Sequence, residues 1–349
     1  MAEPLLTVDG LEVAFATDQG LARVLDKVNF SIDAGEIVGL VGESGCGKTT
    51  LARSILGILP TNTARILSGS IRFEGRDLLT VDEADLASDF RGRVVTFVPQ
   101  DPFSSFNPVF TIGSQIMELM KWKSPNAGKP GLFGRYDQQR READYQRILQ
   151  LMQTVQLPDA EGILRKYPHE VSGGQRQRLM IAMALLPEPR LIIADEPTTA
   201  LDVTIQAQIL KLLRQLARER GVAVLFTTHD LGAAYEICDR ITVMYAGQEV
   251  ESAAADRFFA RPHHPYTRRL LQSLPSQSGN IQGIPGQIPG LVKPPSGCRF
   301  HPRCPLAAPD CSANRPDVAW PAEGHMLRCF NPETTAIAGK GRKNDRQGS

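Results

Sequence analysis

The sequence of 349 residues has almost no excess of charge of either sign, because 39 Lys and Arg side chains are matched by 38 Asp and Glu. A nucleic-acid-binding protein usually carries a basic excess, so no nucleic-acid partner is expected. Long apolar runs are also missing. The run Leu179–Leu186 stops at Pro187, far short of the roughly 18–20 apolar residues that span a bilayer. The first residues, Met1–Pro4, lack the basic and apolar regions of a signal peptide. These absences predict a cytosolic protein that works at a membrane only through other chains.

Cysteines are scarce through most of the chain and crowded at its end. Cys46 and Cys238 are isolated, whereas the remaining four of the six fall in the last sixth of the sequence, at Cys298, Cys304, Cys311 and Cys329. A cytosolic protein of this size is not expected to form disulfides. The crowded group therefore needs another explanation.

Short aliphatic runs alternate with segments of helical spacing. This order predicts an α/β core with a mostly parallel sheet. The expected strands lie at residues 11–15, 28–32, 36–41, 71–73, 94–98, 191–194, 223–227 and 241–244, and the clearest helices at 49–59 and 176–186. A polar, basic insert at residues 121–141 is expected to be an exposed loop.

One glycine-rich stretch, Gly42–Thr49, reads G-x-x-x-x-G-K-T between a buried strand and a helix. Glycines let the backbone wrap closely around a phosphate, and the N–H groups of a helix N-terminus present partial positive charge to it. Lys48 can reach the β- and γ-phosphates of a nucleotide, and the Thr49 hydroxyl can bind Mg²⁺. The stretch predicts a nucleotide-binding loop made by Gly42, Ser44, Gly45, Cys46, Gly47, Lys48, Thr49 and Thr50, with Cys46 as a tolerated small side chain.

The aliphatic strand at residues 191–194 ends in two carboxylates, Asp195 and Glu196. Asp195 is placed to bind Mg²⁺, directly or through water, and Glu196 is placed to act as the base that polarises an attacking water. The pair alone is a weak signal. Together with the phosphate-binding loop it predicts nucleotide hydrolysis.

A second glycine-bearing helix start lies between these two motifs, at Val171–Gln175. It resembles the LSGGQ signature of the ATP-binding cassette (ABC) ATPases, with Val171 in place of the usual Leu. In that family the signature of one subunit closes on the nucleotide held by the phosphate loop of another. The resemblance implies a head-to-tail dimer that sandwiches two ATP molecules, with contacts from Ser172, Gly173, Gly174 and Gln175.

Four further positions match elements of the same family in order. The resemblance implies that Gln100 is the Q-loop glutamine, that Asp202 belongs to the D-loop and that His229 senses the γ-phosphate. Phe15 stands where the family places an aromatic on the adenine, although a core Phe on a strand is an equal alternative. The implied catalytic residues are Glu196, His229 and Gln100, and the implied Mg²⁺ ligands are Thr49, Gln100 and Asp195.

The resemblance covers about residues 5–270. It implies a P-loop NTPase core of the α/β class with an antiparallel β subdomain, a helical subdomain and a small Cys-rich C-terminal extension. The expected boundaries are 1–274 for the ATPase domain, about 105–185 for its helical subdomain, 275–297 for a Pro/Gly-rich linker, 298–330 for the Cys-rich region and 331–349 for a disordered tail.

Several stretches look more specifically like the peptide-importer branch of the family, the dipeptide/oligopeptide and nickel type. They are Gln100–Pro102 with Asn107–Pro108, Tyr167–Glu170, Met244–Gly247 followed by Glu251, and Pro262–Thr267, whose histidine pair is interpreted as part of a turn. The branch implies an ATPase that drives peptide uptake from the cytoplasmic face of the membrane. Its partners would be a second ATPase, related or identical, two transmembrane permease subunits and an external substrate-binding protein. The alternatives are a soluble ABC ATPase of DNA repair or translation, and an exporter ATPase.

The segment with four cysteines has few large apolar side chains and many prolines. Such a segment needs a staple or must pack on something else. Cysteine gaps of five, six and seventeen residues lack the paired knuckles usual for zinc. The segment resembles the C-terminal extension of dipeptide-importer ATPases, some of which hold a [4Fe–4S] cluster there. A [4Fe–4S] cluster on Cys298, Cys304, Cys311 and Cys329 is therefore the leading expectation, with zinc and no metal as the alternatives.

Overall fold

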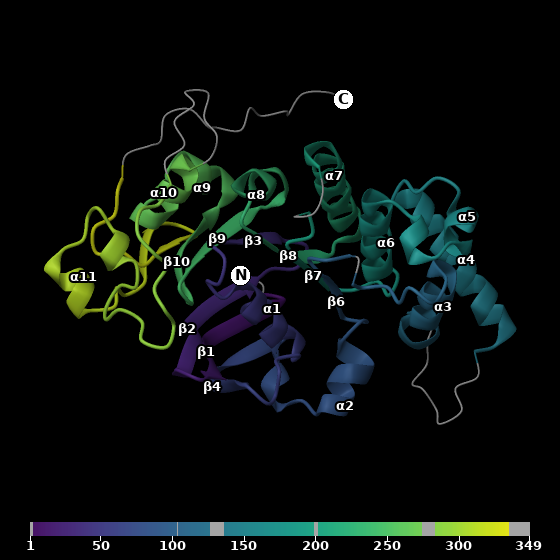
Figure 1. Ribbon diagram of the computed structural model, residues 1–349, viewed down its shortest axis with the longest axis horizontal. Coiled ribbons are helices and arrows are strands. Elements are labelled where there is room, and N and C mark those ends of the chain that lie inside the picture. The colour runs from purple at the N-terminus through teal and green to yellow at the C-terminus, as the bar shows by residue number, and fades with distance from the viewer. Residues whose placement is uncertain (1–2, 103, 126–135, 199–201, 274–282, 335–349) are drawn as a thin grey trace. The chain divides into compact units, whose positions relative to one another are not determined.

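The computed structural model describes residues 3–102, 104–125, 136–198, 202–273 and 283–334. They form two compact units, and both combine strands with helices (Figure 1). The first unit is drawn from Met1–Ile32, Val38–Asp77 and Thr228–Ser349, and the second from Asp33–Ile37 and Leu78–Thr227. The first unit thus takes its residues from both ends of the chain.

The N-terminal part of the first unit is an antiparallel sheet with the strand order β2-β1-β4-β5. The long strand β1 pairs with β2 on one side, Leu6 opposite Ile32, and with β4 on the other, Leu6 opposite Phe73. Leu6 and Val8 of β1 are buried and, after a register shift, so are Leu11 and Val13, in keeping with the two-residue period of a strand. This is the antiparallel β subdomain that the family resemblance implies. Its strands span Leu6–Thr17 (β1), Gly20–Ile32 (β2), Ala64–Phe73 (β4) and Arg76–Asp77 (β5).

The rest of the first unit is built around a second group of strands. Strands β3 and β9 are parallel, with Val38 opposite Arg240, and β9, β10, β12 and β11 continue as an antiparallel series. Helix α9 packs against β9 and β10 (Figure 1). The strands span Ile37–Val41 (β3), Arg240–Tyr245 (β9), Gln248–Ala254 (β10), Ala319–Ala322 (β11) and His325–Leu327 (β12), and the helices span Lys48–Leu56 (α1), Leu231–Ile237 (α8), Ala255–Ala260 (α9), Pro265–Gln272 (α10) and Pro309–Ala313 (α11), with a 3₁₀ turn at His301–Arg303.

The second unit contains three parallel strands and a group of helices. Leu191 of β7 lies opposite Val95 of β6 and opposite Ala223 of β8, and helix α6 packs on β6 and α7. The strands span Val95–Val98 (β6), Leu191–Asp195 (β7) and Ala223–Thr228 (β8), of which the second unit holds all but the last residue. The helices span Glu83–Asp85 (α2), Ile112–Lys123 (α3), Gln138–Thr154 (α4), Ala160–Arg165 (α5), Gly173–Leu185 (α6) and Val203–Arg220 (α7), with short helical turns at Leu78–Thr80, Leu86–Phe90 and Pro168–Glu170.

Helix α1 is shorter than the sequence predicts. It begins at Lys48 and ends at Leu56, because Gly57 adopts a left-handed conformation with a φ of 64°. The Gly57 amide and the following amide of Ile58 donate to the carbonyls of Ser54 and Arg53, which satisfies the end of the helix. The expected end at residue 59 overlooked this glycine cap.

The insert predicted at residues 121–141 is helical at both ends. Helix α3 continues to Lys123, and α4 begins at Gln138 after Asp137, whose side chain accepts a hydrogen bond from the Arg140 amide at 2.8 Å. The expected loop is therefore shorter on both sides, and residues 126–135 lie outside the described residues. No helix among the described residues has the length and apolar character needed to cross a membrane.

The cysteine-bearing segment packs on the core of the first unit. Strand β12 pairs with β10, with Leu327 opposite Glu251. Phe300 is almost fully buried, and its ring meets those of Tyr245 and Tyr266 at centroid distances of 5.1 and 5.3 Å. Of the two alternatives that the sequence left open, a staple or packing on another part of the protein, the structure shows packing.

Candidate active site

The phosphate-binding loop follows strand β3 in the first unit. All five residues of β3 are buried, so the loop starts from a fixed position. A Cβ at Gly42 would lie 2.3 Å from the Met244 carbonyl oxygen, and one at Gly47 would lie 2.9 Å from Cδ2 of Leu25. Only glycine fits at either position. These close contacts shape the loop before helix α1 begins.

Lys48 is the first residue of α1, and its side chain turns back into the loop. Its Nζ donates to the carbonyl oxygens of Gly42 at 2.8 Å and Glu43 at 3.3 Å, and the residue is buried. Ser44 and Gly45 are exposed, while Thr49 and Thr50 are half-buried. The loop thus combines a fixed cation with accessible backbone at its tip.

Cys46 is part of the wall of the loop. It is buried, and burial raises the pKa of its thiol. Its carbonyl accepts a hydrogen bond from Gly247 at 2.9 Å. A protonated, buried thiol is a packing group, which agrees with the interpretation of Cys46 as a tolerated small side chain.

The two carboxylate residues at the end of β7 lie in the second unit, where Thr227 of β8 forms hydrogen bonds with both residues. The Thr227 hydroxyl donates to Oδ1 of Asp195, and the Glu196 amide donates to the Thr227 carbonyl at 3.0 Å. Glu196 has a φ of 47°, a left-handed conformation that is uncommon for a residue with a side chain. Thr227 was not predicted as a site residue. The only signal for it was its place beside Asp195 in the next strand of a parallel sheet.

Gln100 approaches Glu196 from the end of β6. Its Nε2 donates to Oε2 of Glu196 at 3.2 Å, and Gln100 is exposed. The structure therefore brings these two predicted catalytic residues into direct contact. Asp195, by contrast, is buried at its strand end.

The signature segment, residues 171–175, forms the start of helix α6. The Ser172 hydroxyl accepts from the Gln175 amide at 3.2 Å, while Oε1 of Gln175 accepts from the Ser172 amide at 3.0 Å, which is a capping box. A Cβ at Gly174 would lie 3.2 Å from Cγ2 of Ile205 in α7, whereas one at Gly173 would meet no atom within 4 Å among the described residues. A side chain at residue 174 would therefore need Ile205 to shift slightly, whereas one at residue 173 would not displace any described atom.

The remaining predicted residues are distributed over both units. Asp202 is the N-cap of α7 and accepts from the Ile205 amide at 3.0 Å. His229 is exposed rather than buried in the core, and Phe15 is half-buried on β1. The phosphate loop, Phe15 and His229 belong to the first unit, and Gln100, Asp195, Glu196, Asp202 and the signature segment belong to the second.

The four C-terminal cysteines are free thiols. The backbone amide of Cys298 donates to the carbonyl of Cys311 at 2.8 Å. Burial raises the pKa of the Cys329 thiol to about 12 and also raises the pKa values of Cys298 and Cys304. Among the described residues, no group of three or more His, Cys, Asp or Glu side chains is arranged to hold a metal ion. The expected [4Fe–4S] or zinc site thus finds no support in the geometry.

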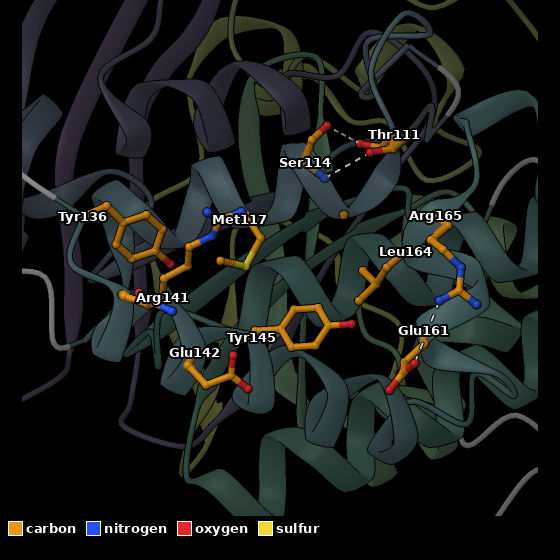
Figure 2. A pocket seen from close by; sticks show the side chains of 12 residues that line it. Thr111, Ser114, Met117, Tyr136, Arg141, Glu142, Tyr145, Glu161, Leu164 and Arg165 are labelled. Atoms are coloured by element: carbon orange, nitrogen blue, oxygen red, sulfur yellow. Dashed lines mark hydrogen bonds and ion pairs between the residues drawn. The ribbon is translucent and has the colours of Figure 1, made fainter.

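A cavity of about 760 Å³ lies among helices α3, α4 and α5 of the second unit (Figure 2). Figure 2 shows the Tyr145 ring of α4 extending toward Leu164 of α5. Arg141 and Glu142 line the same cavity. A neighbouring hollow of about 710 Å³ shares Ser114 with it. Its lining combines the apolar side chains of Phe110, Leu119 and Trp122 with the polar side chains of Gln115, Glu118 and Lys123.

Comparisons with known proteins agree with this geometry. The family model described as "ABC transporter" matches residues 25–199, which include the phosphate loop, Gln100, the signature segment and both carboxylates. The chain belongs to the ABC transporter family of ATPases. A second model, "Oligopeptide/dipeptide transporter, C-terminal region", matches residues 250–311.

Relatives that align with this chain over nearly their full length support the same family assignment. The chain is 45% identical to the probable peptide ABC transporter ATP-binding protein y4tR of Sinorhizobium fredii, over 94% of this chain and 95% of that protein. It is 42% identical to the oligopeptide transport ATP-binding protein OppD of Salmonella typhimurium, over 95% of each. The resemblance to the peptide-importer branch is thereby confirmed, and the alternative of a DNA-repair or translation ATPase is not supported.

Solved structures confirm the P-loop fold. A dimeric ATP-binding cassette in a post-hydrolysis state with ADP and Pi has a TM-score of 0.60 and 25% sequence identity, covering 72% of this chain and 98% of the cassette. This ABC ATPase hydrolyses ATP, as the match of fold, family and motif order establishes.

Proposed function

We propose that this chain is the ATP-hydrolysing subunit of a peptide importer and drives di- or oligopeptide uptake through separate permease subunits. One observation carries the proposal: an ABC ATPase match and an oligopeptide/dipeptide transporter C-terminal match occur in the same chain. The named relatives, aligned over nearly their full length, are peptide or oligopeptide ATP-binding proteins.

The roles of the site residues follow from their chemistry. Lys48 and the loop amides would hold the β- and γ-phosphates, because a fixed ammonium and a helix N-terminus both stabilise anionic oxygen. Thr49, Gln100 and Asp195 would hold Mg²⁺, which neutralises phosphate charge when bound. Their oxygens are ligands that Mg²⁺ prefers, and the carboxylate of Asp195 is oriented by the Thr227 hydroxyl.

Glu196 is proposed as the base that accepts a proton from the attacking water. Gln100 contacts its Oε2 and so orients the carboxylate. The left-handed backbone conformation of Glu196 sets the direction in which its side chain leaves the main chain. Strained backbone conformations of this kind are common at active sites. His229 would contact the γ-phosphate, and its exposed position leaves it accessible to a ligand.

Two subunits are proposed to close on two ATP molecules, each signature segment meeting the partner's nucleotide. The open Gly173 and the exposed Ser172 at the start of α6 support this arrangement. The second subunit would be a related ATPase or a copy of this chain. An external substrate-binding protein would deliver the peptide, and the ATPase would lie at the cytoplasmic face of the membrane.

A surface of the second unit is proposed to receive a cytoplasmic segment of the permease. Val109 is 72% exposed and Phe110 55%, and Trp122 of α3 is 41% exposed. Large apolar side chains grouped at the surface mark interaction sites more often than chance. Phe110 and Trp122 line the hollow of about 710 Å³, which shares Ser114 with the larger cavity. An importer ATPase must transmit force to its permease, so this apolar surface is the part of the second unit best suited to that contact.

The [4Fe–4S] cluster on the four C-terminal cysteines stays a separate proposal. Its support is the donor set: four thiols within one packed segment, close enough to influence one another's pKa. Their arrangement here does not fit a metal, so loading a cluster would require the thiols to reorient and deprotonate.

The function is tested with Glu196→Gln, purified and reconstituted with the permease subunits in vesicles. We expect ATP binding to persist, turnover to fall by more than about a hundredfold, and an ATP-bound dimer to accumulate, because the base is lost while the binding groups remain. The wild-type complex should take up a labelled oligopeptide only with ATP. Near-normal hydrolysis by the variant would overturn Glu196 as the base, and ATP turnover without peptide uptake would overturn the peptide assignment.

A further inference from the structure

The cysteine-bearing segment is tied directly to the phosphate-binding loop. Nη1 of Arg303 lies 2.8 Å from Oε2 of Glu43, and Nη2 lies 3.1 Å from Oε1. Glu43 is the second residue of the phosphate-binding loop, and Arg303 precedes Cys304. This is a two-pronged ion pair between residues 260 positions apart, and both belong to the first unit.

Every nitrogen of the Arg303 guanidinium donates a hydrogen bond. Its Nε donates to the carbonyl of Pro285 at 2.9 Å and its Nη2 to that of Ile284 at 3.1 Å. Its Nη1 also reaches the Tyr245 hydroxyl at 3.2 Å. The side chain is only 4% exposed. An Arg fixed in this way has little freedom left to lose, so its geometry is set before any ligand binds.

The backbone of Glu43 is held from the same region. Its amide donates to the Tyr266 hydroxyl at 3.0 Å, and the Tyr266 ring meets the buried Phe300. Phe300 and Arg303 lie in the same cysteine-bearing segment. Both the side chain and the amide of Glu43 are therefore positioned by residues from the C-terminal third of the chain.

Glu43 presents an electrostatic problem that this contact solves. The loop must receive the negatively charged phosphates of ATP, yet Glu43 adds a carboxylate, 25% exposed, next to Gly42. A bare negative charge there repels the ligand. The Arg303 guanidinium neutralises that charge and directs the carboxylate toward the C-terminal segment.

We propose that Arg303 is a positioning residue for ATP binding: it restrains and neutralises Glu43 so that the phosphate loop accepts the triphosphate. The inference rests on the ATPase function and adds a group that no motif of the site supplies. It makes the C-terminal segment a working part of the nucleotide site. Because Arg303 acts through Glu43, its effect depends on whether residue 43 carries a charge.

That dependence gives the test, in which ATP affinity, KM, kcat and urea unfolding are measured on the full chain. Arg303→Gln leaves the Glu43 charge uncompensated, so we expect the Kd and KM for ATP to rise about tenfold, the size of effect of one unpaired charge near a ligand. Its kcat should change less than twofold. Glu43→Gln alone should weaken ATP binding less than Arg303→Gln does, and adding it to Arg303→Gln should restore most of the lost affinity. Arg303→Lys, which keeps the charge without the two-pronged geometry, should be intermediate.

A merely structural clamp gives a different pattern. The double variant lacks the ion pair just as the single variants do, so a clamp predicts equal losses in all three and no recovery. That result, or unchanged affinity in Arg303→Gln, would overturn the proposal. Arg72→Gln is the matched control, because Arg72 forms an exposed 3.5 Å ion pair with Asp9 in the same unit. Absence of ATP hydrolysis by the wild-type chain and its complex would instead count against the proposed function, since the affinity comparison does not need turnover.

Discussion

Nε2 of His325 lies 2.8 Å from Oε1 of Glu251, and both side chains are almost completely buried. The same carboxylate accepts the backbone amides of His263 at 2.7 Å and His264 at 3.0 Å. Burial alone raises the pKa of Glu251, but the hydrogen bonds from His325 and the His263 amide lower it below its usual value. One buried anion thus joins the strand pair β10–β12 to the turn that precedes α10.

Removing one partner of this contact should destabilise the first unit. We expect His325→Phe to lower the free energy of unfolding by about 3 kcal/mol, because the carboxylate stays buried with one hydrogen bond fewer. Urea unfolding at pH 7 measures the change. His169→Phe makes the same substitution at an exposed histidine and should change stability by less than about 0.5 kcal/mol. Equal effects of the two substitutions would contradict the role given to the contact.

Stability should depend on pH through His264. Burial lowers the pKa of His264 to about 4, and its Nδ1 accepts the Tyr266 amide at 3.0 Å. The unfolded chain binds a proton at His264 near pH 6.5 while the folded chain does not, so stability falls as the pH drops from about 6.5 to about 4, by about 3 kcal/mol from this residue. His264→Asn keeps an acceptor for the Tyr266 amide without titrating. An unfolding profile as steep in that variant as in the wild type would refute the prediction.

The two glycines of the signature segment should respond differently to alanine. At Gly173 a Cβ has room among the described residues, so Gly173→Ala should keep or slightly raise stability, yet lower ATP turnover more than about tenfold by obstructing the partner's nucleotide. At Gly174 the Cβ would lie 3.2 Å from Cγ2 of Ile205, so Gly174→Ala should have a lower unfolding midpoint than Gly173→Ala. Thermal unfolding and ATPase assays of both variants separate packing from nucleotide contact. Full activity in Gly173→Ala would argue against a signature contact there.

The cluster proposal has a direct chemical test. Anaerobic purification followed by iron, sulfide and zinc analysis should yield about four iron and four sulfide per chain if a [4Fe–4S] cluster is present. Cys311→Ser should then lose the iron, whereas Cys238→Ser, at an isolated and buried cysteine, should retain it. A colourless, metal-free and folded wild-type protein would remove the cluster.

The apolar surface around Phe110 and Trp122 should be needed for coupling and not for nucleotide binding. We expect Phe110→Ser combined with Trp122→Ser to reduce co-purification with the permease subunits and peptide uptake at least about fivefold, while ATP affinity stays within twofold. Trp320→Ser removes a Trp that is 65% exposed in the first unit and serves as the matched control. Normal assembly of the double variant would place the permease contact elsewhere.

The form of the phosphate loop could be predicted from the sequence because its chemistry requires particular residues at fixed spacing. The phosphate loop needs Gly42 and Gly47 for close backbone contacts, and the structure shows both contacts. The aliphatic runs that became β3, β7 and β8 are buried throughout, so composition alone identified them as strands.

Strand β10 escaped prediction for the opposite reason. Gln248, Glu249 and Glu251 make it look polar and exposed, yet its first six residues are buried. Their partners lie far away in sequence: Arg328 reaches Oε1 of Glu249 at 2.9 Å, and His325 reaches Glu251. A local sequence pattern cannot predict that a carboxylate is buried when its partner follows more than seventy residues later. The pairing of Arg303 with Glu43 was hidden in the same way.

The first unit can complete its folding only late in synthesis of the chain. Its contacts join segments that leave the ribosome at very different times, such as Asn29 with Glu249 and Glu43 with Arg303, 220 and 260 positions apart. The second unit is complete once residue 227 has emerged. Strand β2 pairs with β1 early in synthesis but must wait for β10, which it also contacts. During synthesis, which adds about 5–20 residues per second, β2 waits roughly 10–40 seconds for β10. We therefore expect the nucleotide loop to acquire its native form only after nearly the whole protein has been translated.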